Sequence, residues 1–265
     1  MSEKAIGVFD SGVGGLTVLK ALMRRLPGES TAYLGDTARV PYGTKSPEVV
    51  TRYSLANGRF LIGQQIKLLV VACNTASSVS LPALSQALNV PVVGVIEPGA
   101  TAAARTVTGK VGIIGTPGTI RSGAYQAALA TLRPGTQVLA RACPLFVPLA
   151  EEGWTDGEVV ELVAKKYLAD FHAFGVDTLV LGCTHYPLLK AAIAKEMGEG
   201  TALVDSAEAT ADAVEALLSE RGELSKGAAA KHRYFVTDLP ERFAEVGARF
   251  LERPIEKAEL VDISL

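Results

Sequence analysis

The sequence predicts an α/β protein of two similar parallel-sheet domains, related by pseudo-symmetry, with the active site in the cleft between them. Two stretches carry this prediction: LLVVACNTAS at 68–77 and LVLGCTHYP at 179–187 each read as a buried strand that leads through a cysteine into a helix. Cys73 and Cys183 therefore occupy matching places, 110 residues apart. A third observation is the strand-like segment 110–114 followed by GTPGT, which repeats the first strand and its turn.

The amino-acid composition limits the kinds of molecule that this protein is expected to bind. The chain has 265 residues, of which 48% are apolar and 20% charged, so it can bury a substantial core. Its formal net charge of −2, with acidic and basic residues interspersed, gives no electrostatic footprint for nucleic acid or an anionic membrane. We therefore expect a small-molecule substrate and neither nucleic acid nor membrane as a partner. The sequence leaves open whether the chain works alone or as a homodimer.

The cellular location and the redox state follow from two further features. The amino terminus, MSEKAIGVFD, enters a predicted strand without an apolar signal segment, and no run approaches the roughly 18 residues needed to span a bilayer. We expect a cytoplasmic protein. The three cysteines, Cys73, Cys143 and Cys183, fit neither a disulfide framework nor a metal site, because they are odd in number and widely spaced. Reduced thiols are expected, and no cofactor or metal.

The first element is a strand over 6–9, followed by the glycine-rich turn DSGVGG and a helix over 16–26. A dinucleotide fingerprint would need a third glycine where Thr17 stands, which argues against that interpretation. Asp10 and Ser11 instead place a carboxylate and a hydroxyl at the carboxyl end of a strand. Backbone N–H groups beside them could hold an anion.

The next elements complete the first half of the repeat. A strand over 31–34 leads into a polar loop over 35–43, which we expect to line the cleft. Ser46 and Pro47 are a cap and first helical residue of a helix through about 65. The helix after Cys73 is expected to be interrupted at Pro82, which starts another through 88. A strand over 90–96 and the crossing Glu97-Pro98-Gly99 follow.

The second half repeats this alternation. Its expected elements are helices over 100–106, 156–174 and 187–197 and strands over 110–114, 138–142, 178–181 and 203–205. The tail reads as a helix over 207–218, a solvated connection over 219–231, strands over 233–237 and 254–260, and a helix over 241–251, and carries no identifiable chemistry. The predicted first domain is 1–97 with 209–265, and the second is 98–208.

Four motifs taken together resemble one enzyme family. They are DSGVGG at 10–15, PYG at 41–43, ACNTAS at 72–77 and GCTHYP at 182–187. This set closely resembles the glutamate racemase family, and the similarity runs over almost the whole chain. The resemblance implies an isomerase that interconverts L- and D-glutamate without a cofactor. Such an enzyme supplies D-glutamate for peptidoglycan biosynthesis, and hence for cell wall biogenesis and cell shape.

Two thiols suit this reaction. Racemisation removes a proton from one face of Cα and delivers another to the opposite face, so two acid/base groups must flank one carbon. Cys73 and Cys183 would be those groups. The pKa of a thiol, usually about 8.5, is lowered toward 7 by a helix amino terminus or neighbouring donors, and both cysteines precede a predicted helix. We expect one thiolate opposite one thiol, titrating as a coupled pair.

The resemblance also implies roles for individual residues. Asp10 would assist Cys73. His185 would assist Cys183, with Glu151 as a third carboxyl group near the second thiol. The residues implied to bind the substrate are Asp10, Ser11, Tyr42, Gly43, Asn74, Thr75, Thr119, Thr184 and His185.

Alternatives stay open at this point. Glu152 could replace its neighbour as the third carboxyl group, Asp10 could merely cap the first helix, and His185 could be a packed histidine. Structural roles are expected for Cys143, His172 and His232, which match no racemase motif, and for Trp154, expected to pack near the loop at 151. The rival functions are a racemase of another acidic amino acid, such as aspartate, and a non-enzymatic α/β ligand-binding protein with inert cysteines.

Overall fold

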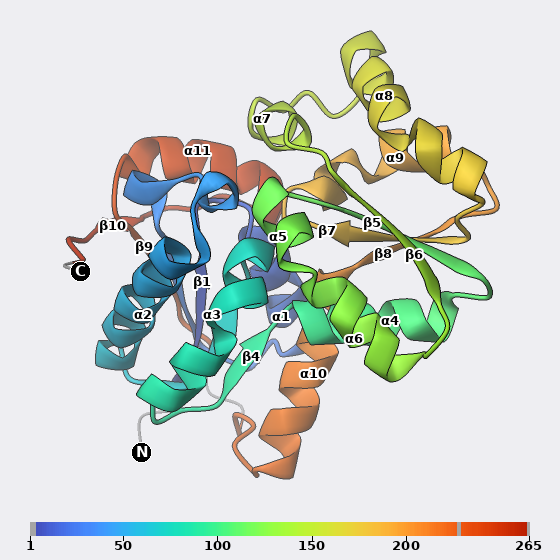
Figure 1. Ribbon diagram of the computed structural model, residues 1–265. Coiled ribbons are helices and arrows are strands. Elements are labelled where there is room, and N and C mark those ends of the chain that lie inside the picture. The colour runs from blue at the N-terminus through green and yellow to red at the C-terminus, as the bar shows by residue number, and fades with distance from the viewer. Residues whose placement is uncertain (1–3, 227–228, 264–265) are drawn as a thin grey trace.

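Two parallel β-sheets organise the computed structural model, which describes residues 4–226 and 229–263 (Figure 1). The first sheet comprises β1 (Ala5–Asp10), β2 (Thr31–Gly35), β3 (Ile66–Val71), β4 (Val92–Gly94), β9 (His232–Val236) and β10 (Glu259–Leu260). The second comprises β5 (Lys110–Gly115), β6 (Gln137–Ala142), β7 (Thr178–Gly182) and β8 (Ala202–Asp205). The strand orders are β10-β9-β2-β1-β3-β4 and β6-β5-β7-β8.

The two sheets share one topology. In each, the first strand of the unit lies between the second and the third, and the fourth pairs with the third, giving β2-β1-β3-β4 and β6-β5-β7-β8. The third strands, β3 and β7, are the ones that lead to the two cysteines. The predicted fold class is therefore confirmed, and the relation between the halves places Cys73 and Cys183 at equivalent strand ends.

Helices cover both faces of each sheet, which is why the central strands are almost continuously apolar. The helices are α1 (Leu16–Arg25), α2 (Pro47–Gly63), α3 (Asn74–Ala87), α4 (Ile96–Thr106), α5 (Pro117–Ser122), α6 (Ala124–Leu132), α7 (Phe146–Glu151), α8 (Glu158–Phe174), α9 (Lys190–Met197), α10 (Ser206–Glu220) and α11 (Pro240–Leu251). Three short 3₁₀ segments are η1 (Thr37–Arg39), η2 (Tyr42–Thr44) and η3 (Tyr186–Leu189). All residues of β1 and β7 are buried beneath these layers.

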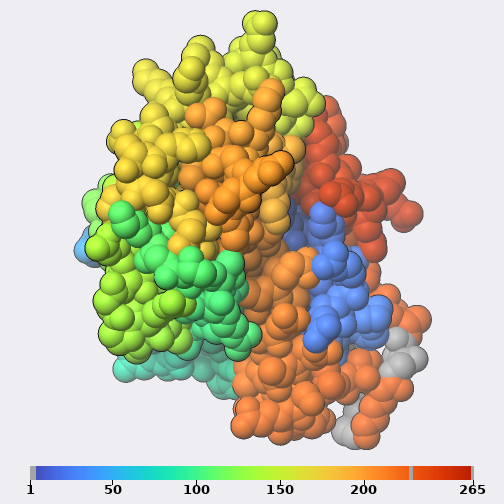
Figure 2. Space-filling view, turned by 90° about the vertical axis from the view of Figure 1, so that its right-hand side faces the viewer, coloured from blue at the N-terminus to red at the C-terminus, as the bar shows by residue number. Residues whose placement is uncertain are grey.

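The chain passes between the sheets twice, at α4 and at α10. In Figure 2 the orange segment that includes α10 lies between the yellow and green part of the surface and the blue N-terminal residues. This position agrees with the packing of α10 against α1. The expected domain boundaries, at 97/98 and 208/209, fall in the first turns of these two helices. The division into two domains stays a prediction.

Several expected boundaries are wrong for physical reasons. The helix after Cys73 is one continuous α3 with Pro82 inside it, and the side chain of Pro82 faces solvent, where water can satisfy the carbonyl group that the proline leaves unbonded. The residues expected as a crossing, 97–99, lie in the first turn of α4, so the preceding strand is shorter than expected. His232 begins β9 rather than ending a connection, and Pro187 lies in η3 ahead of α9.

Other expectations hold. Ser46 Oγ accepts a hydrogen bond from the backbone N–H of Val49, with Pro47 as the first helical residue of α2. The short helices α5, α6 and α7 were not foreseen, and two residues of the expected connection, 227 and 228, lie outside the described part of the chain. Within the described part, no helix combines the length and the apolar character needed to cross a bilayer.

Candidate active site

A cavity of about 210 Å³ lies where the carboxyl ends of strands from both sheets meet. This is where open α/β sheets bind ligands. Its lining includes both predicted thiols, one from each half of the repeat. The lining residues are Ser11, Pro41, Tyr42, Gly43, Thr44, Cys73, Asn74, Thr75, Thr116, Pro117, Pro144, Val147, Pro148, Cys183, Thr184 and His185.

Cys73 is the N-cap residue of α3. Its Sγ accepts a hydrogen bond from the backbone N–H of Ala76 at 3.5 Å and lies 3.9 Å from the hydroxyl of Ser11. Burial raises the pKa of Cys73 to about 12, and the charge of Asp10 adds to this, while the donors at Ala76 and Ser11 oppose it. The expected near-neutral pKa is therefore wrong for this thiol, because desolvation outweighs the helix terminus.

Cys183 lies in a chain of contacts with a histidine and a carboxylate. Its Sγ is 3.8 Å from Nδ1 of His185, and Nε2 of the same ring is 2.9 Å from Oε1 of Glu151. Burial by itself lowers the pKa of His185, but the hydrogen bonds and charges of Cys183 and Glu151 outweigh burial and raise that pKa. The arrangement favours a protonated imidazole between the thiol group of Cys183 and the carboxylate of Glu151.

The same geometry distinguishes the two adjacent glutamates. Burial tends to raise the pKa of Glu151, yet the hydrogen bond from His185 and its charge leave that pKa below its usual value. The side chain of Glu152 is 65% exposed and lies 3.6 Å from Arg242. Glu151, not Glu152, is the carboxylate in contact with His185.

Asp10 lies beneath the cavity wall instead of lining it. It is buried, and its Oδ2 accepts a hydrogen bond from the backbone N–H of Gly12 at 3.0 Å. The N-cap position of helix α1 is Gly15, five residues after Asp10. Burial raises the pKa of Asp10, although the charge of His185 and nearby backbone N–H groups oppose the rise.

The C-terminal tail contributes to the site through α11. The rings of Phe250 and His185 meet edge to face, with centroids 5.2 Å apart and an interplanar angle of 80°. Arg249 donates from Nη2 to the backbone carbonyl of Glu151 at 2.8 Å. The tail was expected to carry no chemistry, and no motif marks these residues. Their contacts join segments 98 residues apart for Arg249 with Glu151 and 65 residues apart for Phe250 with His185.

The hydroxyl group of Tyr42 belongs to a buried hydrogen-bond network. That hydroxyl donates to Oδ2 of Asp36, a fully buried carboxylate whose Oδ1 accepts from Arg39 at 2.8 Å and from Thr237 at 3.0 Å. Asn57 donates to the same hydroxyl at 3.0 Å. Tyr42 thus contributes its backbone and ring to the lining, and the buried network around Asp36 fixes the loop.

Three threonines meet across the two halves. Thr75 Oγ1 is 2.8 Å from Thr116 Oγ1 and 3.3 Å from Thr119 Oγ1. Thr75 and Thr116 line the cavity, whereas Thr119 lies behind them, fully buried. Thr116 was missed, although it follows β5 as Ser11 follows β1 in the related half, and that correspondence could have indicated it.

Gly14 shows why the turn after β1 contains glycine. A Cβ atom there would lie 2.5 Å from Nδ1 of His185, which is closer than real Cβ contacts allow. Thr17 of the following helix donates from Oγ1 to the backbone carbonyl of Thr184 at 3.1 Å. The turn therefore needs glycine so that the first half can approach the histidine of the second.

The remaining singled-out residues lie outside the cavity. Cys143 is buried, with Sγ 3.8 Å from the carbonyl oxygen of Arg141, and burial raises its pKa to about 12. His172 contacts the backbone carbonyl of Glu196 through Nε2, and His232 contacts Thr31. Trp154 is 56% exposed, and its backbone N–H donates to the carbonyl of Leu149 at 2.8 Å.

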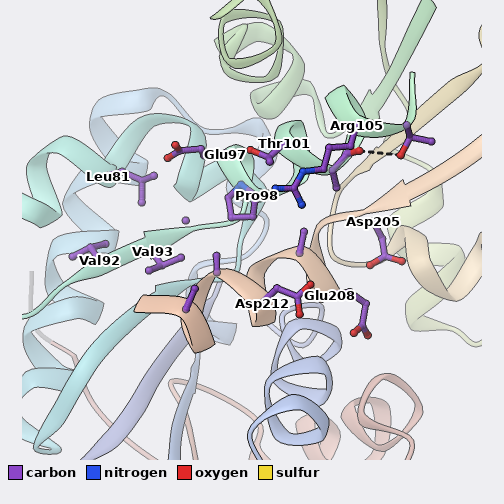
Figure 3. A pocket seen from close by; sticks show the side chains of 16 residues that line it. Leu81, Val92, Val93, Glu97, Pro98, Thr101, Arg105, Asp205, Glu208 and Asp212 are labelled. Carbon is purple, nitrogen blue, oxygen red and sulfur yellow. Dashed lines mark hydrogen bonds between the residues drawn. The ribbon is translucent and has the colours of Figure 1, made fainter. Parts of the chain in front are cut away.

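A larger cavity, of about 860 Å³, lies between β4, α4 and α10 (Figure 3). Its polar lining consists mainly of carboxylates with one arginine, namely Glu97, Asp205, Glu208, Asp212 and Arg105. It lacks any cysteine or histidine among its described lining residues. The two thiols predicted as acid/base groups and the histidine beside them thus gather in the smaller cavity.

The chain resembles known proteins along nearly its whole length. The sequence profile of the Asp/Glu/Hydantoin racemase family matches residues 6–214. A glutamate racemase of Geobacter metallireducens is 62% identical over 254 residues, covering 95% of this chain and 94% of the relative. Among solved structures, a glutamate racemase of Bacillus anthracis has a TM-score of 0.95 at 43% identity, with 99% and 98% of the two chains covered. The Francisella tularensis glutamate racemase, solved in complex with D-glutamate, has a TM-score of 0.93 at 40% identity and the same coverage.

Proposed function

The chain belongs to the Asp/Glu/Hydantoin racemase family, and from this premise we propose that it interconverts L- and D-glutamate by proton transfer between Cα and two cysteines. The chain is an isomerase acting on amino acids, as its glutamate racemase relatives are. One observation carries the two-base mechanism. Cys73 and Cys183 follow equivalent strands of two related sheets and line one cavity.

Each thiol serves one face of the substrate carbon. In the L-to-D direction, the Cys183 thiolate removes the Cα proton, and the electron pair stays on the carbon and its carboxylate. The Cys73 thiol then delivers its proton to the opposite face. The reaction ends with a thiol at Cys183 and a thiolate at Cys73, so the reverse direction uses the same groups with exchanged roles.

The surroundings favour this starting state. His185, held by Glu151, places a positive charge beside Cys183, where the proposed reaction of L-glutamate starts from a thiolate. Cys73 is held as a thiol by burial and by the nearby Asp10. A substrate ammonium group entering the cavity would lower the pKa of Cys73 by its positive charge, which makes the thiolate accessible when D-glutamate is the substrate.

Substrate binding is proposed to rely on polar groups around the two thiols. Hydroxyl and amide groups from both halves line the cavity, and the backbone N–H groups at the start of α3 can hold a carboxylate. Asp10 and Thr119 support this lining from behind. The residues proposed to contact glutamate are Ser11, Tyr42, Gly43, Asn74, Thr75, Thr116, Thr184 and His185.

The biological role is proposed from the same reaction. D-glutamate made by this chain would enter peptidoglycan. Because the precursors of peptidoglycan are made in the cytoplasm, we propose that the protein is located there. Sedimentation of the purified protein, with and without glutamate, separates a single chain from the homodimer that the sequence left open.

The decisive experiment incubates the purified protein, without added cofactor, with each enantiomer of glutamate and of aspartate. It follows the optical rotation of the amino-acid solution over time. We expect both glutamate enantiomers to converge on the same mixture, and aspartate to turn over far more slowly. Activity should survive dialysis against a chelator and a carbonyl reagent. A preference for aspartate would favour the related racemase, and absence of turnover with all four would contradict the proposal.

A further inference from the structure

We propose that Tyr125 is a positioning residue that holds the side-chain amide of Asn74 with its NH₂ group turned into the cavity, where it binds a carboxylate of the substrate. The inference deepens the proposed function and rests on it. Tyr125 does not line the cavity, and neither motif nor resemblance singles it out.

The two residues come from different halves of the molecule. Asn74 is the first residue of α3 in the first half, and Tyr125 lies in the first turn of α6 in the second. The Tyr125 hydroxyl donates to Oδ1 of Asn74 at 2.8 Å. Both side chains are buried, and Asn74 lines the cavity beside Cys73.

The hydrogen-bonding pattern fixes which end of the amide faces the cavity. The hydrogen of the Tyr125 hydroxyl points to Asn74 and needs an acceptor there. An amide oxygen accepts, whereas an amide NH₂ only donates. Oδ1 of Asn74 therefore turns toward Tyr125.

The NH₂ group of Asn74 consequently remains available as a hydrogen-bond donor. Nδ2 is buried, and among the described residues it has no hydrogen-bond partner. Buried polar groups are nearly always paired, and an unpaired one is costly. A carboxylate acceptor in the cavity satisfies this donor, and glutamate brings two carboxylates.

The tyrosine ring is itself held in place by two close approaches. A Cβ atom on Gly99 of α4 would lie 3.1 Å from the Tyr125 hydroxyl oxygen, and one on Gly182 at the end of β7 would lie 3.1 Å from Cε2 of the ring. The ring thus fills a slot between α4 and β7. Phenylalanine fits the same slot, so Tyr125→Phe removes only the hydroxyl group.

The test is steady-state racemisation by Tyr125→Phe. Without the hydroxyl group, the Asn74 amide is no longer oriented before substrate binds, so the variant should raise KM for both enantiomers about tenfold and change kcat by less. Tyr234→Phe is the matched control, since it removes a buried tyrosine hydroxyl on β9, away from the cavity, and should leave KM unchanged. An unchanged KM in Tyr125→Phe, or a loss confined to kcat, overturns the proposal.

A double-variant comparison separates positioning from general loosening. Asn74→Ala should raise KM, and adding Tyr125→Phe to it should raise KM no further, because Tyr125 acts only through Asn74. A further rise would mean that Tyr125 acts by another route. The Kd for D-glutamate, measured by calorimetry on the same variants, gives this comparison without requiring catalysis. It therefore measures the coupling between Tyr125 and Asn74 even if the proton-transfer scheme fails.

Discussion

His185 Nε2 lies 2.9 Å from Oε1 of Glu151, while the other ring nitrogen faces the thiol of Cys183 at 3.8 Å. One imidazole thus joins a carboxylate at the edge of the cavity to a thiol inside it. Both partners stabilise the protonated ring, which raises the pKa of His185 against the opposing effect of burial. The raised pKa favours the protonated ring, which lies beside the proposed base for L-glutamate.

Glu151→Gln keeps a hydrogen-bond acceptor but removes the charge. The pKa of His185 should fall, so the ring loses its proton at lower pH and the alkaline limb of the kcat/KM profile for L-glutamate moves to lower pH. At a pH above the shifted limb we expect a loss of about tenfold for each pKa unit of the shift, and little loss at neutral pH. Glu152→Gln is the control, because Glu152 is mostly exposed and contacts Arg242 instead. Equal effects from both changes would rule out a specific role for Glu151.

Replacing either thiol by serine removes one proton carrier and leaves the other. Racemisation should fall about 10² to 10⁴-fold in both directions. A glutamate analogue with a leaving group next to Cα distinguishes the two faces, because its elimination needs only the first deprotonation. Cys73→Ser should retain elimination from the L-analogue and Cys183→Ser from the D-analogue. If both variants lose both eliminations equally, one thiol per face is wrong.

Alkylation by iodoacetamide near pH 7 should modify Cys183 first. Thiolates react and thiols do not. The proposed mechanism starts with a thiolate at Cys183, beside His185, while burial raises the pKa of both Cys73 and Cys143 to about 12. Glutamate should protect, and peptide mass mapping identifies the labelled site. Cys143→Ala should leave the labelling rate unchanged. Preferential reaction at Cys143 would contradict the assignment of the thiols.

Asp36→Asn tests the buried network behind Tyr42. The change leaves the mostly buried Arg39 without its ionic partner, so the free energy of unfolding should fall by about 3 kcal/mol in a denaturant titration. Asp170→Asn is the matched control, because its ion pair with Arg141 is largely exposed, and it should cost less than about 1 kcal/mol. A comparable loss in the two variants would show that the Asp36 network adds no special stability.

Gly14→Ala tests the close approach between the halves. The new methyl group would lie 2.5 Å from His185 Nδ1, so the ring must shift, and we expect kcat to drop by at least about tenfold. Gly63→Ala adds the same atom where no described atom lies within 4 Å, and should keep full activity. Full activity in Gly14→Ala would show that the ring position tolerates displacement.

The sequence by itself determined the parallel α/β fold, the repeat and the placement of Cys73 and Cys183. These are local properties: an apolar run, a small polar residue and a helix start recur after equivalent strands, and parallel strands bring their carboxyl ends to one edge of a sheet. The same reasoning failed at Pro82, where an exposed position lets the helix continue.

Only the tertiary structure decided which groups act on the two thiols. Glu151 was separated from Glu152 by the direction of a side chain at the end of α7, and Tyr125 and Phe250 reached the site from helices that no motif marks. The pKa of Cys73 likewise depends on burial between two halves of the chain, which outweighs the helix terminus visible in the sequence. Desolvation and contacts between distant segments arise only when the halves pack together, so they lie beyond what local sequence patterns specify.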